Sequence, residues 1–390
     1  MIKNIDNPQN KERIAIVAIG YNRLSALKRL LQSLNEAHYA NGSVPLVISI
    51  DASGDLELYN YVNQFVWNYG EKYVNIQQER LGLKKHIFQC FSLSKYFKGV
   101  ILLEDDIFVS PYFYHYANET IRRYGNEEKV AGISFYTNEY NGFHGLPQQF
   151  INNGNDVFAW QSVCSWGEMM NERMWSNFEN WMLTFDGSFD KFDMNDVIKG
   201  WTRAWSKYVY AYMLQTDTYF IYPYQPLTTN FNDAGGEHGG GSSIVQVSLI
   251  QGRHDYQLGD FSELEHYDVY GYNKDMYKWL NIDESELTVD FYGDHYGHSG
   301  RYLLTTSTLP YKKIRGFGLC MRPWELNVKY SISGNDIILY ERSGNETERK
   351  SKITCSYDFI MYHLQRYQQH ITFKLLLRRY LKSLLLRFKF

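Results

Sequence analysis

The stretch from Val100 to Val109 constrains the fold most, because three acidic residues, Glu104, Asp105 and Asp106, follow directly on an apolar run. Val100 to Leu103 is continuously hydrophobic, as is typical of a strand covered on both faces. In open α/β sheets ligands bind beyond the carboxyl ends of the strands, where these acids fall. Adjacent carboxylates repel each other unless a cation lies between them, and hard oxygen ligands suit Mg²⁺ or Mn²⁺ carrying a phosphate. The pattern therefore predicts a strand whose end is a ligand site, and the alternative is a solvated acidic turn.

Strands and helices alternate before this point. The hydrophobic pattern predicts strands over 14–19, 44–50 and 73–77, each followed by a helical segment, over 24–34, 56–69 and 83–96. Such alternation is typical of βαβ units. The expected fold class is therefore α/β, with a mostly parallel, Rossmann-like sheet flanked by helices.

The pattern changes further along the chain. Short strands and aromatic-rich helices are expected over 131–229, followed by a loop rich in glycine over 230–243. Val328 to Glu341 reads as two strands that turn at Ser333-Gly334-Asn335, and 351–355 as another strand. The expected organisation is a first domain over 1–245, an extension with short strands over 246–360, and a terminal helix over 361–390.

Composition excludes some classes and suggests a compartment. The formal net charge is −3, so no global basic field indicates a nucleic-acid partner. Aromatic residues make up 17% of the chain, which suits amphipathic ligands such as sugars, or simply an aromatic core. Four widely spaced cysteines, a polar N-terminus and the lack of a twenty-residue apolar stretch favour a cytoplasmic location.

The last twenty residues, 371–390, form a basic amphipathic pattern. Leucines share one helical face, while Lys374, Arg378 and Lys382 follow at four-residue steps on another. A helix of this kind lies in the plane of an anionic membrane surface. The sequence therefore predicts a protein peripheral on the inner face of the cell membrane; the alternative is a terminal helix docked on the domain.

Five pieces in a fixed order carry a family resemblance. They are Ala15 to Arg23, the strand ending at Asp51, Leu102 to Phe113, Ser165-Trp166-Gly167 with Trp175, and Tyr222-Pro223 leading to the loop at His238. In this order they resemble the GT-A glycosyltransferases, specifically bacterial family 2 enzymes that share features with N-acetylglucosaminyltransferase I. The resemblance runs from about Ile14 to His238. It implies a donor part over about 14–130, an acceptor part over about 131–245, and a nucleotide-sugar donor.

The resemblance also implies roles for three residues of the donor part. Arg23 would lie near the diphosphate or the base, and Asp51 would contact the uracil or the ribose. His86 would contact the donor from the helix after the third strand. The alternatives are that Asp51 caps a helix and that His86 lies on a helix surface.

The acidic motif corresponds to the metal signature of the family. Asp106 would bind Mn²⁺ or Mg²⁺, while Asp105 and Glu104 would support the ribose, the sugar or a metal-bound water. A divalent cation stabilises the charge that develops on the leaving diphosphate. His238 falls where related enzymes carry a histidine near the diphosphate or the metal; the alternative is a surface loop without a role in catalysis.

The expected general base is missing. Relatives carry an acid directly after a tryptophan, where this chain has Thr202 after Trp201, and a threonine hydroxyl is no base near neutral pH. The candidates are Asp196, less favourably Asp193, or Glu168 after Ser165-Trp166-Gly167. A retaining or inactive enzyme is the remaining alternative.

These observations favour a metal-dependent glycosyltransferase that uses a UDP-sugar and a glycan or lipid-linked acceptor. The expected reaction inverts the anomeric carbon and serves the synthesis of bacterial surface polysaccharide. A non-catalytic glycan-binding or scaffolding protein is the alternative that Thr202 favours and the acids Glu104 to Asp106 oppose. A nucleotidyltransferase is a further alternative, but the turn from Gly20 to Arg23 is a poor phosphate loop.

Overall fold

The chain forms two compact units. The computed structural model describes residues 5, 7–40, 42–235, 245–295, 300–342 and 353–368. Unit 1 consists of residues 1–138 and 150–274, and unit 2 of residues 139–149 and 275–390. Within the described ranges, no helix is long and apolar enough to cross a membrane. His238 and the segment 371–390 lie outside the described residues.

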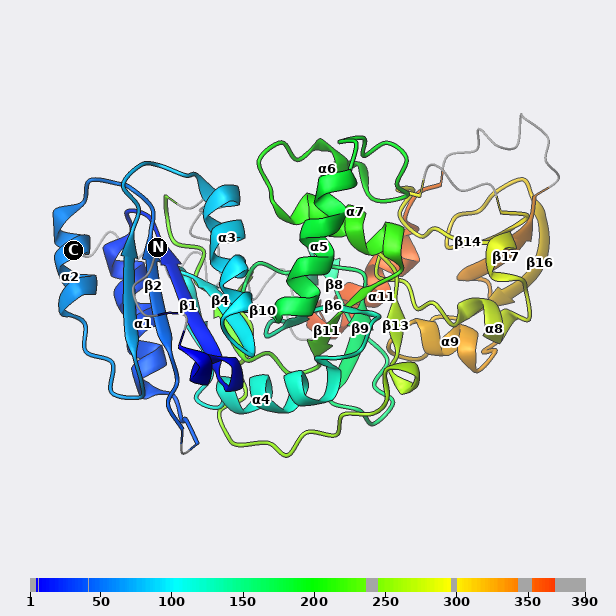
Figure 1. Cartoon of the computed structure of the whole chain (residues 1–390). Helices are drawn as coiled ribbons and strands as arrows, with labels where there is room; N and C mark the ends of the chain where they lie inside the picture. The colour runs from blue at the N-terminus through cyan, green and yellow to red at the C-terminus, as the bar shows by residue number, and fades with distance from the viewer. Residues whose placement is uncertain are drawn as a thin grey trace, which may run out of the picture. The chain divides into compact units, whose positions relative to one another are not determined.

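Unit 1 begins with an alternation of strands and helices, as predicted (Figure 1). Parallel pairing gives the strand order β3-β2-β1-β4. Residues of β1, β2 and β4 are almost all buried, because helices cover both faces. The elements of this part are β1 Ile14–Gly20, α1 Leu24–Glu36, β2 Leu46–Ile50, α2 Leu56–Gln64, β3 Lys72–Ile76, α3 Leu83–Phe91 and β4 Gly99–Glu104.

The sheet continues beyond β4 with mixed pairing. In the described part of unit 1 nine strands follow in the order β13-β9-β11-β6-β10-β4-β1-β2-β3, and β10 runs antiparallel to both of its neighbours. Because most pairs are parallel and helices flank the sheet, the predicted fold class is confirmed. The further elements are α4 Phe113–Tyr124, β6 Val130–Ser134, β9 Val157–Trp160, β10 Glu168–Met170, α5 Glu172–Thr184, α6 Asp196–Gly200, α7 Ser206–Thr216, β11 Tyr219–Pro223 and β13 His266–Tyr267.

A second pair of strands follows the acidic motif. β5 (Ile107–Val109) pairs antiparallel with β12 (Thr228–Asn230), so that Asn230 lies opposite Ile107. The backbone N–H of Phe231 donates to the carbonyl oxygen of Asp106 at 2.9 Å. This pairing brings the segment around Asn230 against the end of β4, although more than a hundred residues separate the two in the sequence.

Unit 2 contains a four-stranded sheet in the order β14-β15-β17-β16, with only β14 and β15 parallel. A small hairpin of β7 and β8 belongs to the same unit. Its elements are β7 Tyr140–Asn141, β8 Leu146–Pro147, α8 Met276–Leu280, β14 Leu287–Val289, β15 Tyr302–Thr305, β16 Lys312–Phe317, α9 Glu325–Lys329, β17 Ile337–Glu341 and α11 Tyr357–Gln368.

The hairpin expected over Val328 to Glu341 is wrong in its first half. Val328 lies in the helix α9, and only 337–341 is a strand. The Asn327 side chain accepts hydrogen bonds from the backbone N–H groups of Cys320 and Met321 and donates to the Trp324 carbonyl, which fixes this segment as a loop and helix. Residues 353–355, the described part of the other expected strand, are not in a strand either.

Candidate functional site

The acidic motif lies at the point where the strand order reverses. The chain passes outward from β1 to β2 and β3 and then returns to place β4 on the other side of β1. Ligand sites of open α/β sheets form at the carboxyl ends of two such strands. Arg23 follows β1, and Asp105 and Asp106 follow β4, so the fold brings these predicted residues together.

The Arg23 guanidinium bridges the two carboxylates. Its Nη1 donates to Asp106 Oδ2 at 3.1 Å and its Nε to Asp105 Oδ2 at 3.3 Å, while Nη2 donates to both side chains. The three side chains are 17%, 5% and 13% exposed for Arg23, Asp105 and Asp106. A guanidinium therefore supplies the cation that the repulsion of adjacent carboxylates requires.

Electrostatics at this cluster favour a further positive charge. Burial raises the pKa of Asp105 to about 6, an effect that Arg23 opposes and the neighbouring Asp106 reinforces. Although burial lowers the pKa of Arg23, its two carboxylate partners hold that pKa above the ordinary value. One guanidinium thus serves two buried acids, and a ligand cation would be stabilised beside them.

Asp106 has a second neighbour that the register of β12 supplies. Asn230 Nδ2 donates to Asp106 Oδ1 at 3.2 Å. The following segment is held by Arg29 of α1, which pairs with Asp233 and lies 3.8 Å from the Phe231 ring centroid. No local sequence pattern indicates Arg29 or Asp233 as site residues, because their pairing depends on the long-range packing of α1 against this segment.

Asp51 holds the turn that leads into α3. Its carboxylate accepts from the backbone N–H groups of Leu81 at 2.8 Å, Gly82 at 2.9 Å and Ala52 at 2.9 Å, and the residue is 5% exposed. Gly82, with φ +74°, adopts a left-handed conformation that favours glycine. The carboxylate thus fixes the backbone at the edge of the sheet where the resemblance places a nucleobase.

His86 is buried, so its alternative position on a helix surface is wrong. The residue is 3% exposed, and its Nε2 lies 2.7 Å from Ser49 Oγ of β2. Burial lowers the pKa of the imidazole, although Asp51 opposes the effect. His86 is therefore neutral near pH 7 and packs beneath the edge of the sheet that Asp51 organises.

Glu168 is buried in the middle of the sheet. It is 0% exposed, and neither carboxyl oxygen has a hydrogen-bond partner among the described residues. Its register opposite Leu102 directs its side chain to the same face as Glu104, two residues further along β4. Burial, and next the nearby Glu104, raise the pKa of Glu168 well above its usual range. As placed, Glu168 is a neutral acid, whereas a general base has to be ionised.

The glycine before Glu168 has a structural reason. Gly167 has φ +106°, and a Cβ at this position would lie 2.8 Å from Thr228 Cγ2. The Thr228 hydroxyl donates to the carbonyl oxygen of Trp166 at 2.6 Å. The segment Ser165-Trp166-Gly167 therefore packs directly against β12, which carries Asn230 to the acids.

The other base candidates lie on the surface. Asp196 opens α6, its side chain is 66% exposed, and it lies 3.9 Å from Lys199 Nζ. Asp193 is exposed and accepts a hydrogen bond from the Tyr270 hydroxyl at 2.7 Å. Thr202 is exposed as well. The structure gives no contact between any of the three and the acidic motif.

The donor set at the motif consists of carboxylate oxygens. Within the described ranges no three His, Cys, Asp or Glu side chains converge as metal ligands. Mg²⁺ is commonly bound by one or two carboxylates together with substrate phosphates and waters. The carboxylates of Asp105 and Asp106 are the described side chains at this position that could hold a divalent cation of that kind.

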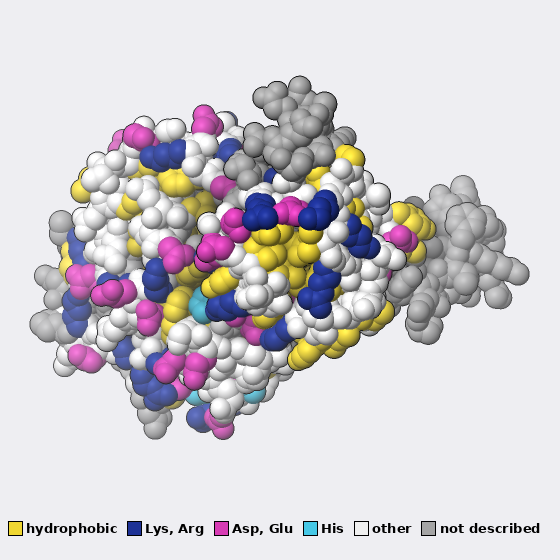
Figure 2. Space-filling view, turned by 90° about the vertical axis from the view of Figure 1, so that its right-hand side faces the viewer, with side chains coloured by type: hydrophobic (Ala, Val, Ile, Leu, Met, Phe, Trp, Pro, Cys, Tyr) yellow, Lys and Arg dark blue, Asp and Glu magenta, His cyan; other side chains and the backbone are white. Residues whose placement is uncertain are grey.

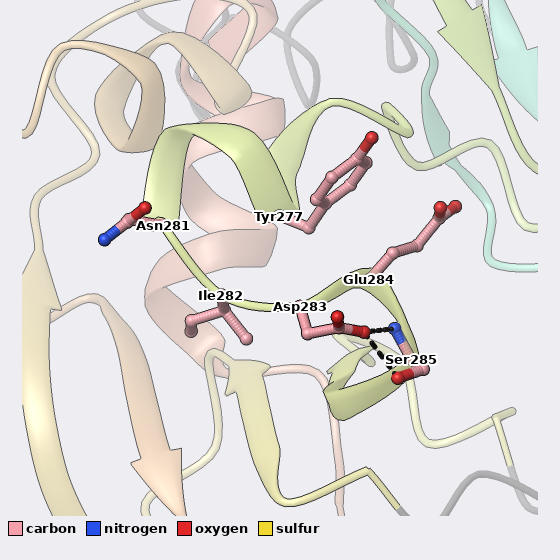
Figure 3. A pocket seen from close by; sticks show the side chains of 6 residues that line it. All are labelled: Tyr277, Asn281, Ile282, Asp283, Glu284 and Ser285. Carbon is pink, nitrogen blue, oxygen red and sulfur yellow. Dashed lines mark hydrogen bonds between the residues drawn. The ribbon is translucent and has the colours of Figure 1, made fainter.

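A pocket in unit 2 contains none of the predicted site residues (Figure 3). Its volume is about 910 Å³, and Tyr277, Asn281, Ile282, Asp283, Glu284 and Ser285 line it. Asp283 accepts a hydrogen bond from the Ser285 backbone N–H at 2.9 Å, which lowers its pKa together with the Ser285 hydroxyl. The hydrogen bonds to Ser285 show that Asp283 caps a short turn.

Comparison with known proteins gives similar structures only. No family model matches the sequence, and no curated protein matches it. The chain is similar to a mannosyltransferase from Pyrobaculum calidifontis, solved with GDP-mannose and Mn²⁺, with a TM-score of 0.35 and 12% identity over 57% of this chain and 59% of that one. It is also similar to residues 1–349 of S. aureus TarS with UDP-GlcNAc, with a TM-score of 0.39 and 13% identity over 59% of this chain and 61% of that one. The match thus spans about three fifths of each of those chains.

Proposed function

We propose that this chain is a glycosyltransferase that moves a sugar from a nucleotide-diphosphate donor, a UDP-sugar, to a glycan or lipid-linked acceptor. The observation that carries the proposal is the cluster of Arg23, Asp105 and Asp106 at the strand-order reversal of a parallel sheet. A bound diphosphate needs positive charge and hydrogen-bond donors around it. The need is greater when the diphosphate leaves, because negative charge then develops on it. Arg23 lies at this position with its donors on the two acids, and a cation bound beside those acids would add the positive charge that a diphosphate needs.

In the proposed reaction Asp106 holds a divalent cation, Mn²⁺ or Mg²⁺, with Asp105 beside it. The cation would supply Lewis-acid stabilisation of the charge on the leaving diphosphate. Asp51 would organise the edge that receives the nucleobase, because it fixes the turn at Leu81 and Gly82, and His86 packs against Ser49 beneath this edge. Glu104, at the end of β4, would accept hydrogen bonds from ribose or sugar hydroxyls.

The proposed reaction inverts the anomeric carbon, with Asp196 as the acceptor's general base. Asp196 is the candidate whose exposed side chain is open to an acceptor. His238 would lie near the diphosphate. The second candidate function is a glycan-binding protein that lacks catalysis, which the buried, neutral state of Glu168 and the position of Thr202 favour.

Calorimetric titration of the full chain with UDP, GDP and CDP, each with and without Mn²⁺, tests the donor site. We expect one nucleotide to bind in a Mn²⁺-dependent way, and Asp106→Ala to weaken this binding at least a hundredfold, because removing a metal ligand removes the main anchor of the diphosphate. Asp196→Ala is the matched control, since loss of an exposed acid should leave nucleotide binding unchanged. Absence of binding to all three nucleotides would refute the proposal, and binding without donor hydrolysis or transfer would favour the glycan-binding function.

We further propose that the protein works at the inner face of the bacterial cell membrane in surface polysaccharide synthesis. The basic amphipathic pattern of residues 371–390 supports this location. Deleting 371–390 should move most of the protein from the membrane fraction to the soluble fraction while nucleotide binding persists. Unchanged fractionation of the truncated chain would contradict the role of this segment.

A further inference from the structure

One strand of unit 2 exposes a row of basic side chains. β16 is the edge strand of the unit 2 sheet, and in the described part of the chain it pairs only with β17. Its first four residues, Lys312, Lys313, Ile314 and Arg315, are all exposed, and Ile314 is 45% exposed. The strand becomes buried only at Phe317. An edge strand that turns four successive residues to solvent gives up the burial that normally stabilises a strand.

The cations of β16 are only partly neutralised. Lys312 lies 2.8 Å from Glu341, a carboxylate that it shares with Arg301. Lys313 donates to the neutral amide oxygen of Asn335 at 2.6 Å, and Arg315 lies over the Phe317 ring at 5.0 Å. Among the described residues no carboxylate pairs with Lys313 or Arg315. The strand therefore presents net positive charge.

Charge is distributed unevenly within unit 2. Six of its 18 Lys and Arg lie in 371–390, and the rest of the unit contains 12 against 13 Asp and Glu, so the positive charge of β16 is a local feature. Figure 2 faces the side of unit 2 on which β16 lies, and Lys and Arg side chains there border an area of hydrophobic ones. Apolar surface bordered by cations suits the boundary between the headgroups and the acyl chains of an anionic bilayer.

We propose that β16 of unit 2, through Lys312, Lys313, Ile314 and Arg315, docks on an anionic lipid surface. Each Lys or Arg close to such a surface contributes to binding through the negative potential of the headgroups. Ile314, between the cations, would enter the interface. Lysines on an edge strand also hinder the addition of another strand. The competing occupant, an added strand from a second copy, is therefore an outcome that the experiment has to separate.

Co-sedimentation of the full chain with phosphatidylcholine vesicles, with and without phosphatidylglycerol, tests this docking. The triple variant Lys312→Ser, Lys313→Ser, Arg315→Ser should bind the anionic vesicles roughly a hundredfold more weakly, because three surface cations are lost. The matched control carries Lys95→Ser, Lys98→Ser and Arg122→Ser, three exposed positions of unit 1 with the same change in charge. Thermal unfolding checks that each variant is folded. If the triple variant does not fold, the single variant Lys313→Ser replaces it and should bind the anionic vesicles about fivefold more weakly.

A weakened triple variant beside an unaffected control would support the docking strand. Equal losses in both variants would overturn it, because the effect would then follow from net charge alone. The docking of β16 would also be overturned if the triple variant bound as well as the wild-type chain, or if the wild-type chain did not bind anionic vesicles. A change confined to self-association, measured by sedimentation velocity, would assign β16 to a second copy instead. Vesicle binding requires no donor, so these results are independent of the proposed transfer reaction.

Discussion

Replacing Glu168 with glutamine should raise the free energy of unfolding at pH 7, because burial raises the pKa of this carboxyl well above its ordinary value. The folded chain keeps the buried carboxyl protonated, whereas the unfolded chain releases the proton above the ordinary pKa of 4.5. The cost of holding the proton grows as the pH rises above that value. Glutamine has nearly the same shape and carries no proton to lose, so the variant avoids this cost.

The sign of the pH dependence follows from the same argument. Between pH 4.5 and the raised pKa of Glu168, the unfolded state binds fewer protons than the folded state, so wild-type stability falls relative to the variant as the pH rises. Denaturant unfolding at pH 5, 6 and 7 should show a difference that grows as the pH rises through this range. Glu179→Gln, on the exposed face of α5, is the control and should change stability by less than about 0.5 kcal/mol.

The same variant decides whether Glu168 is the general base. A neutral acid can be replaced by its amide with little effect on transfer, whereas loss of a general base lowers the rate by roughly 10² to 10⁴. A Glu168→Gln variant that is destabilised, or that loses transfer by this factor, would show that Glu168 is ionised in the folded protein. A stabilised and active variant would leave Asp196 as the candidate to test.

The local pattern predicted the end of β4 because a few neighbouring residues determine it. A buried apolar run followed by three acids has to leave the sheet at the acids, and the structure ends β4 at Glu104. The need for a cation between the carboxylates also follows from adjacency alone. That Arg23 meets this need depends on β1 and β4 being neighbours, which the pairing of distant strands decides.

Long-range packing also decides the environments that local patterns misjudged. His86 has a helical position that suits either surface or core, and its buried state comes from Ser49 on a strand 37 residues earlier. Glu168 follows a glycine and resembles the opening of a helix, but pairing with Leu102 and Ser134 places it inside the sheet. In both cases the partner strand determines the ionisation state of the side chain, and with it the chemistry that the residue can perform.

Replacing Arg23 with methionine should lower the free energy of unfolding by about 3 kcal/mol at pH 7, because two adjacent, largely buried carboxylates lose the cation they share. Arg23 opposes the rise in the pKa of Asp105, so without it that pKa rises further above its present value of about 6. The folded variant then binds more protons than the unfolded chain above pH 3.8, and its stability falls as the pH rises through this range. The loss should shrink as the pH falls below about 6, since Asp105 is then protonated in both folded proteins.

The double variant Arg23→Met, Asp105→Asn should recover more than half of the loss, and Arg122→Met, at an exposed helix position, should change stability little. If Asp105 and Asp106 form a cation site, Mn²⁺ should raise the melting temperature of Arg23→Met more than that of the wild-type chain, because the ion replaces the missing charge. Adding Asp106→Ala should abolish this rise. A loss of stability that neither pH nor Mn²⁺ changes would mean that Arg23 acts through packing, and that the two acids do not form a site for positive charge.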